Sequence, residues 1–166
     1  MKKLFFPLLL TLLLISAGCD TPLNQVTGDY SYKQSGLVTF TDDGNNVVST
    51  LATKQGQMNV MRDAHGKKGD ILITFNEMGG GAYTCTGKIK GDSIFFDPHE
   101  FSTRFSTADS LQTLLQVGKV YTVQSAGRGI ISDDMILVEE QWTGKPEDGS
   151  LIRLSADKIT ILAEKN

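Results

Sequence analysis

From Gly28 onward, apolar and polar residues alternate along most of the chain. Ile71, Ile73 and Phe75 fall on one face of an extended segment, with Thr74 and Asn76 on the other. Alternation with many Val, Ile, Thr, Tyr and Phe residues favours half-buried antiparallel strands. Clusters rich in Gly, Asp and Asn supply turns between them. The clearest of these clusters lie at 42–46, 65–69 and 145–149.

The chain therefore predicts an all-β domain of strands joined to their sequence neighbours. Because neighbouring segments can merge, we expect about 8–10 strands in an antiparallel, up-and-down meander. Such a sheet closes into a barrel or folds into a sandwich, and closure removes exposed edges. A barrel of about eight strands is filled by side chains or holds one small ligand. The predicted segments are 28–34, 36–42, 46–54, 57–62, 70–76, 82–90, 93–97, 119–131 and 135–143, with 150–156 and 158–164 as a closing pair.

An internal repeat supports the meander. Residues 87–96 align with 129–138, so that Gly, Ile, Asp, Ile and a final apolar residue coincide, and 154–161 fits the second half of the pattern. Each copy reads as a strand, a turn of two or three residues containing Asp, and a returning strand. That arrangement predicts three tight hairpins.

One short helix is expected at 107–116. Ser106 offers an N-cap with Asp109 three residues later, and Gly118 supplies a stop. Leucines between them recur at helical spacing, so the helix has one apolar face. Two roles follow from this pattern: packing on the barrel, or serving as a lid over a cavity.

The N-terminus has the features of an export signal. Lys2 and Lys3 precede an apolar run at 4–15, which is too short to span a membrane. The residues Ser-Ala-Gly at 16–18 and the following Cys19 resemble the lipobox of bacterial lipoproteins, although that box usually has Leu three places before the cysteine. The resemblance implies cleavage before Cys19 and acylation of its side chain.

The expected organisation is a signal peptide at 1–18, a lipidated tether at 19–27 and a β-barrel domain at 28–166. The protein would be exported and held in the bacterial cell envelope by acyl chains on Cys19, in a leaflet that the sequence leaves open. The tether reaches at most about 30 Å. Lipidation of Cys19 also leaves Cys85 without a disulfide partner, so we interpret Cys85 as a small buried side chain on a strand.

The charge balance argues against nucleic-acid binding. The chain has 16 basic and 19 acidic side chains. Loss of Lys2 and Lys3 leaves 14 basic against 19 acidic, a formal charge of −5 for the mature chain. Since binding to nucleic acid depends on clustered Lys and Arg, an acidic chain without such a cluster is a poor candidate. The membrane is the expected partner, through Cys19, and the oligomeric state is left open.

The mature chain also resembles the calycin or lipocalin-like lipoproteins of Gram-negative bacteria. The residues that carry this resemblance are Gly28-Asp29-Tyr30 at the first strand, the hairpin at 87–94, the repeat of that hairpin pattern at 129–136 and the helix at 107–116. Lipocalins usually open with Gly-x-Trp, whereas this chain has Tyr30 there. The resemblance implies a barrel that binds a small ligand.

We find no catalytic motif, metal-ligand pattern or cofactor motif. His65 and His99 are interpreted as solvated loop residues, and an enzyme would require His99, Glu100 and another acid in one pocket. The glycines at 79–81 lack the Gly-Lys-Ser/Thr of a phosphate loop and read as a flexible connection at a barrel end. The pair Glu139 and Glu140 is expected on opposite faces of a strand, because adjacent side chains of a strand point apart.

The leading hypothesis is a non-enzymatic, membrane-anchored barrel that binds a small hydrophobic or amphipathic ligand. The alternative is a cell-envelope accessory module with a fully packed barrel, which binds protein or glycan and no small ligand. Aromatic side chains on strands are the candidates for lining a cavity. These candidates are Tyr30, Phe75, Tyr83, Phe96, Tyr121 and Trp142.

Overall fold

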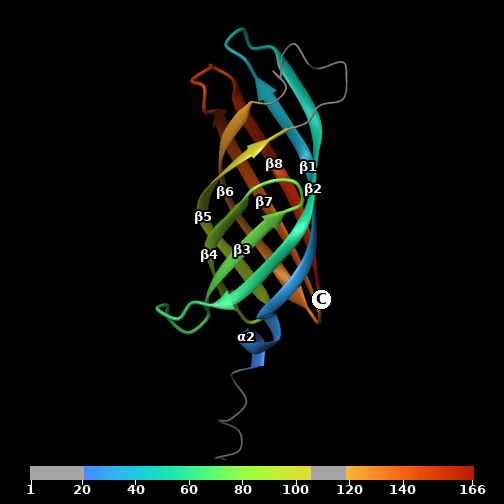
Figure 1. Cartoon of the computed structure of the whole chain (residues 1–166), viewed down its shortest axis with the longest axis vertical. Helices are drawn as coiled ribbons and strands as arrows, with labels where there is room; N and C mark the ends of the chain where they lie inside the picture. The colour runs from blue at the N-terminus through green and yellow to red at the C-terminus, as the bar shows by residue number, and fades with distance from the viewer. Residues whose placement is uncertain (1–20, 106–118) are drawn as a thin grey trace, which may run out of the picture.

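The computed structural model describes residues 21–105 and 119–166. These residues form a closed barrel in which each strand is antiparallel to its neighbours in sequence, and β1 closes on β8 (Figure 1). The predicted all-β, up-and-down barrel is therefore confirmed. Its strands are β1 (Gly28–Thr41), β2 (Val47–Arg62), β3 (Asp70–Glu77), β4 (Ala82–Lys90), β5 (Ser93–Arg104), β6 (Val120–Ser132), β7 (Met135–Pro146) and β8 (Arg153–Lys165).

Eight strands result because several predicted segments are continuous. The turns expected near Ser35 and Gly56 do not exist, since the β1–β2 ladder runs unbroken from Gly28↔Val60 to Thr41↔Val47. Gly56 has no turn role. A Cβ on it would lie 2.0 Å from the Asn76 carbonyl oxygen, so glycine lets β2 approach β3 closely.

The predicted closing hairpin at 150–164 is wrong. Residues on both sides of 157 belong to one strand, β8, whose register shifts against β1 and β7 near this point. Asp157 and Lys158 are both exposed between the inward-facing Ala156 and Ile159. A β-bulge of this kind produces polar residues in mid-strand, which resemble a turn in the sequence.

The other two predicted hairpins are confirmed. Lys90 pairs with Ser93 and Ser132 pairs with Met135, which leaves two residues in each turn. Gly91 has φ of 62° and Asp133 has φ of 49°. Each turn thus places one residue in the left-handed region, where Gly and Asp are favoured.

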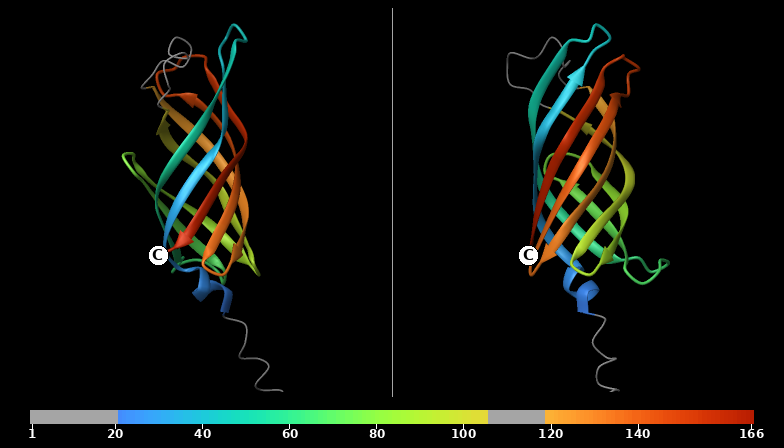
Figure 2. Two further views of the ribbon diagram at one scale, coloured as in Figure 1. Left: turned by 90° about the vertical axis from the view of Figure 1, so that its right-hand side faces the viewer. Right: turned by 180° about the vertical axis from the view of Figure 1, so that it is seen from behind.

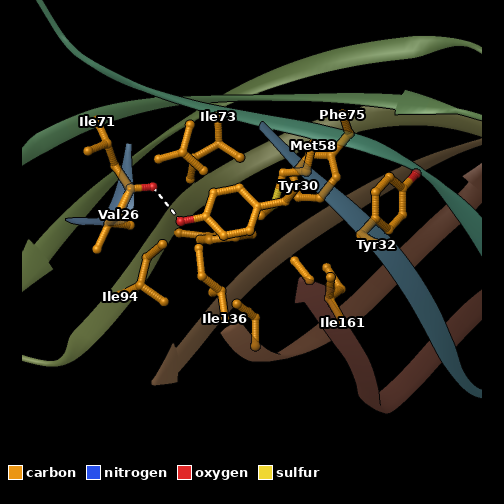
Figure 3. Packing of buried hydrophobic residues seen from close by; sticks show 14 of the residues in the cluster. Val26, Tyr30, Tyr32, Met58, Ile71, Ile73, Phe75, Ile94, Ile136 and Ile161 are labelled. Atoms are coloured by element: carbon orange, nitrogen blue, oxygen red, sulfur yellow. Dashed lines mark hydrogen bonds between the residues drawn. The ribbon is translucent and has the colours of Figure 1, made fainter. Parts of the chain in front are cut away.

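The segment expected to be a free tether is partly helical and closes one end of the barrel. Helix α2 (Thr21–Val26) lies beneath the strands (Figures 1 and 2), and Val26 is 1% exposed. The Tyr30 hydroxyl donates a 2.7 Å hydrogen bond to the Val26 carbonyl inside the barrel (Figure 3). Lys165 Nζ donates to the Gln25 carbonyl at 2.6 Å, so α2 is fixed to the first and last strands.

We call this end of the barrel the α2 end, and the end formed by the turns at 42–46 and 147–152 the distal end. Cys19 and the predicted helix at 107–116 lie outside the described residues. Among residues 21–105 and 119–166, no helix is long and apolar enough to cross a membrane.

Candidate functional site

The interior of the barrel contains two hydrophobic clusters separated by polar side chains. The lower cluster, near α2, includes Tyr32, Met58 and Val138, and the upper cluster includes Val38 and Trp142. On most strands, one inward-facing polar residue falls at the boundary between the two clusters. We call this set the polar layer. Its members are Gln34, Lys54, Glu77, His99, Ser125 and Glu140.

Lys54 connects three strands on one side of the polar layer. Its side chain points inward from β2 and is 9% exposed. Its Nζ lies 2.8 Å from Glu77 Oε2 at the end of β3, and it also donates a hydrogen bond to the Thr103 hydroxyl on β5. The buried Gln34 is Lys54's cross-strand partner on β1, and its Nε2 has no hydrogen-bond partner among the described residues. Two hydrogen-bond donors, the Gln34 amide and the Lys54 ammonium, therefore lie side by side on neighbouring strands.

A lateral groove opens on this side because β3 and β4 are short. The residues of β2 before Gly56 have no β3 partner, and β5 pairs with β4 only from Ser93 to Phe96. The β3–β4 turn at 78–81 therefore lies halfway up the wall, not at a barrel end as expected (Figure 1). The groove has a volume of about 660 Å³. Its lining includes Gln34, Ala52, Lys54, Glu77, Met78, Arg104 and Phe105.

His99 enters the polar layer because of a bulge in β5. Phe96 pairs with Gly127 and His99 pairs with Ser125, so two β5 residues, Asp97 and Pro98, face one residue of β6. The bulge reverses which side chains of β5 point inward. The interpretation of His99 as a solvated loop residue is therefore wrong. Glu100, its expected partner, is exposed on the outside.

The imidazole of His99 presents one free nitrogen to the interior. Its Nδ1 donates to the Asp97 carbonyl at 2.9 Å, because a carbonyl oxygen can only accept. Its Nε2 is buried without a hydrogen-bond partner among the described residues. The ring stacks on Tyr83 with a centroid distance of 5.8 Å.

Glu140 is the most deeply buried carboxyl group in the described part of the chain. It is 1% exposed, and its Oε2 accepts a 2.8 Å hydrogen bond from the Trp142 indole. Burial raises the pKa of Glu140 above its ordinary value, while Trp142, His99 and Ser125 act against that shift. Its Oε1 has no hydrogen-bond partner among the described residues. As expected, Glu139 lies on the opposite face, where it pairs with Lys158.

Tyr83 joins the two hydrophobic clusters at the level of the polar layer. Its ring stacks between Phe75, at 4.8 Å, and Phe101, at 4.6 Å. Burial and the nearby Glu140 raise the pKa of its hydroxyl well above the ordinary value. Stacked rings therefore fill the space where β4 and β5 have no ladder hydrogen bonds, as aromatic pairs of this geometry can.

All six predicted cavity-lining residues face inward, but they pack against one another instead of lining the lateral groove. Tyr30, Phe75 and Phe96 belong to the lower cluster, Tyr121 and Trp142 to the upper one, and Tyr83 contacts both. The residues that the sequence analysis missed are those of the polar layer. The sequence pattern that could have indicated them is a polar residue at an inward position of an alternating segment. Glu140, between Val138 and Trp142 on the buried face of β7, is an example.

The remaining candidates for chemistry are dispersed. Cys85 is buried with a free thiol, as interpreted from the sequence. Burial and the nearby Glu140 raise the pKa of that thiol to about 12. His65 lies exposed in the β2–β3 turn. Among the residues that the structure describes, no three His, Cys, Asp or Glu side chains come together in a way that could hold a metal ion.

Comparisons with known proteins give little further information. No protein-family model matches the chain, and no curated protein matches it. A similar solved structure is that of a protein of unknown function from the DUF3598 family of Nostoc punctiforme. It is 12% identical, with a TM-score of 0.32, over 87% of this chain and 49% of that one. This chain thus spans about half the length of that protein.

Proposed function

We propose that this protein is a non-enzymatic lipoprotein of the bacterial cell envelope whose barrel binds a small amphipathic ligand in the lateral groove. The signal-like segment at 1–18 and Cys19 support export and anchoring. The closed eight-stranded barrel supplies a rigid frame, and the groove supplies a concave site of a size typical of small-molecule sites.

The chemistry of the groove favours an acidic head group on the ligand. The Gln34 amide nitrogen is buried in the groove without a partner among the described residues. Beside it, the Lys54 ammonium contacts Glu77 and Thr103 and has a third N–H for a ligand. Burial of a donor without an acceptor costs free energy, so a ligand that supplies an acceptor gains affinity there. Ala52, Met78 and Phe105 offer apolar contact beside it. The unpartnered Gln34 amide beside Lys54 is the observation that carries the proposal.

Binding is tested with a soluble chain that begins at residue 20 and with dodecanoate as the probe. We expect saturable binding by calorimetry, and weaker binding of dodecanol, which lacks the charge. Lys54→Met should weaken dodecanoate binding about tenfold or more, since hydrogen bonds to charged groups contribute about 1.5–3 kcal/mol. Lys145→Met, at the distal end of β7, is the matched control. Equal affinity of the Lys54 and Lys145 variants would contradict the proposal.

The packed accessory module remains the second candidate, because one observation favours it. The aromatic residues on both sides of the polar layer contact one another closely, including the Phe75–Tyr83–Phe101 stack. A barrel of this kind needs no ligand to fill it. Absence of saturable binding, both for dodecanoate and for envelope lipid extracts, would favour this alternative.

The anchor is tested separately. Cys19→Ser should abolish incorporation of labelled fatty acid into the full-length chain and leave the precursor uncut. Normal processing of that variant would disprove the lipobox assignment without affecting the groove.

A further inference from the structure

We infer that the α2 end of the barrel rests on the bilayer and that a basic pocket beside α2 binds the phosphate groups of anionic phospholipids. This inference rests on the proposed lipidation of Cys19. Only two Cα steps, about 7.6 Å at most, separate Cys19 from Thr21 at the start of α2. An acylated Cys19 therefore leaves no length for a stalk, and α2 must lie at the membrane surface.

Helix α2 cannot swing freely about this short connection. Val26 is buried in the lower cluster, and its carbonyl accepts the hydrogen bond from Tyr30. Asn24 accepts a 3.1 Å hydrogen bond from Arg62 at the end of β2. Because α2 is held by β1 and β2, the orientation of α2 sets the orientation of the barrel. The distal end lies opposite α2 (Figure 2) and would then face away from the membrane.

The basic pocket lies between α2 and the β2–β3 turn and has a volume of about 450 Å³. Its floor includes Leu23 and Ile89, and three exposed basic side chains line it. These are Arg62, Lys67 and Lys68. An apolar floor under a basic rim fits a phospholipid, whose glycerol and acyl chain follow an anionic phosphate.

Two acidic groups, Asp63 and Asp70, lie at the ends of the β2–β3 turn that carries the basic side chains. Asp70 forms a 3.1 Å ion pair with Lys88 and accepts a hydrogen bond from the Lys67 backbone amide. Asp63 itself lines the pocket, and its carboxylate accepts a hydrogen bond from the His65 backbone amide. These contacts also fix the shape of the turn, so the basic side chains project from a defined loop and not from a disordered one.

Charge also selects which side of the α2 end lies nearest the lipid. The β6–β7 turn at the same end carries Asp133 and Asp134, which an anionic surface repels. The β2–β3 turn carries the basic pocket and projects outward beside α2 (Figure 1). The barrel is therefore tilted with the β2–β3 turn toward the membrane. The overall acidic charge of the mature chain does not prevent this local attraction, because surface charges are screened beyond about 8–10 Å.

The test uses the mature lipidated protein in vesicles of phosphatidylcholine, with and without phosphatidylglycerol. Hydrogen exchange of the amides at 62–69 should slow several-fold only in the vesicles that contain phosphatidylglycerol. The double variant Lys67→Glu and Lys68→Glu should lose this effect. Lys145→Glu with Arg153→Glu, which changes the net charge equally at the distal end, should retain it. Unchanged exchange in the strands shows that each variant is folded.

The outcomes distinguish failure of the phospholipid site beside α2 from failure of the lipid anchor at Cys19. Equal exchange at 62–69 in both kinds of vesicle, for protein that floats with the vesicles, overturns the basic pocket and leaves the anchor intact. Slower exchange at the distal turn 42–46 overturns the orientation. A protein that does not float with either vesicle is not lipidated; the anchor and the phospholipid site then both fail, whereas ligand binding in the lateral groove is unaffected.

Discussion

Trp142 donates its indole N–H to the carboxylate of Glu140, with 2.8 Å between Nε1 and Oε2, inside the barrel. The two residues lie on β7, two positions apart, so both side chains point inward. The indole places the carboxylate at the boundary between the two hydrophobic clusters. A single charge-assisted hydrogen bond replaces only part of the hydration that an ionised carboxylate loses on burial.

We predict that Glu140 makes the protein less stable as the pH rises. Its pKa is raised by burial above its ordinary value of 4.5. The folded state therefore binds a proton more tightly than the unfolded state does. The free energy of unfolding falls as the pH climbs from 4.5 through the raised pKa, by up to about 1.4 kcal/mol per pH unit.

Glu140→Gln should remove this pH dependence, because a neutral amide can still accept the Trp142 hydrogen bond. Denaturant unfolding at a series of pH values measures the effect. Glu139→Gln is the matched control, since Glu139 lies outside on the same strand and pairs with Lys158. A wild-type stability curve parallel to that of Glu140→Gln would contradict a raised pKa at Glu140.

We predict that Cys85 is unreactive in the folded protein. Burial and the nearby Glu140 raise the pKa of its thiol to about 12, so almost no thiolate exists near pH 8. Labelling with a thiol reagent should be slow in buffer and fast in denaturant. Labelling at the same rate under both conditions would contradict the buried position.

The sequence predicted the strands from alternation, but it could not locate the bulges. Phe96 and His99 are three residues apart, so regular alternation would place them on opposite faces of β5. The bulge at Asp97 and Pro98 makes both side chains point inward. The bulge at Asp157 and Lys158 has the polar pattern of a turn. Each bulge is defined by the residues that face it on a partner strand, and a local pattern within one strand does not report them.

The polar layer was hidden for a related reason. Gln34 and Glu140 each look like one exception within an apolar face. Their common level becomes clear only when the strands are set side by side. Burial, together with the charges of Glu77 and Glu140, raises the pKa of both Tyr32 and Tyr83, so the two carboxylates lie near the same rings. By contrast, the hairpin turns were predictable, because their residues are contiguous in sequence.

We predict that Gly56→Ala destabilises the barrel, whereas Gly81→Ala does not. A Cβ at Gly56 would lie 2.0 Å from the Asn76 carbonyl oxygen, which is fixed in the β2–β3 ladder. Overpacking of this kind costs about 1–3 kcal/mol. A Cβ at Gly81 meets nothing within 4 Å. Thermal unfolding of both variants checks the prediction, and a stable Gly56→Ala protein would show that β2 and β3 can separate without cost.

The last prediction concerns the attachment of α2. Tyr30→Phe removes the hydroxyl that donates to the Val26 carbonyl at 2.7 Å (Figure 3). The carbonyl stays buried without its partner, which costs about 1–3 kcal/mol. Because Val26 ends α2, we expect the loss to appear as faster hydrogen exchange at 23–28, with a smaller effect on the strands.

Tyr121→Phe is the matched control for this substitution. Tyr121 is 2% exposed, and its hydroxyl is buried without a hydrogen-bond partner among the described residues. Removing that hydroxyl should leave stability unchanged or increase it, because an unsatisfied buried donor is lost. If both variants lose the same stability, the Tyr30–Val26 hydrogen bond does not hold α2. If only Tyr30→Phe releases α2, that contact fixes the helix to the α2 end of the barrel.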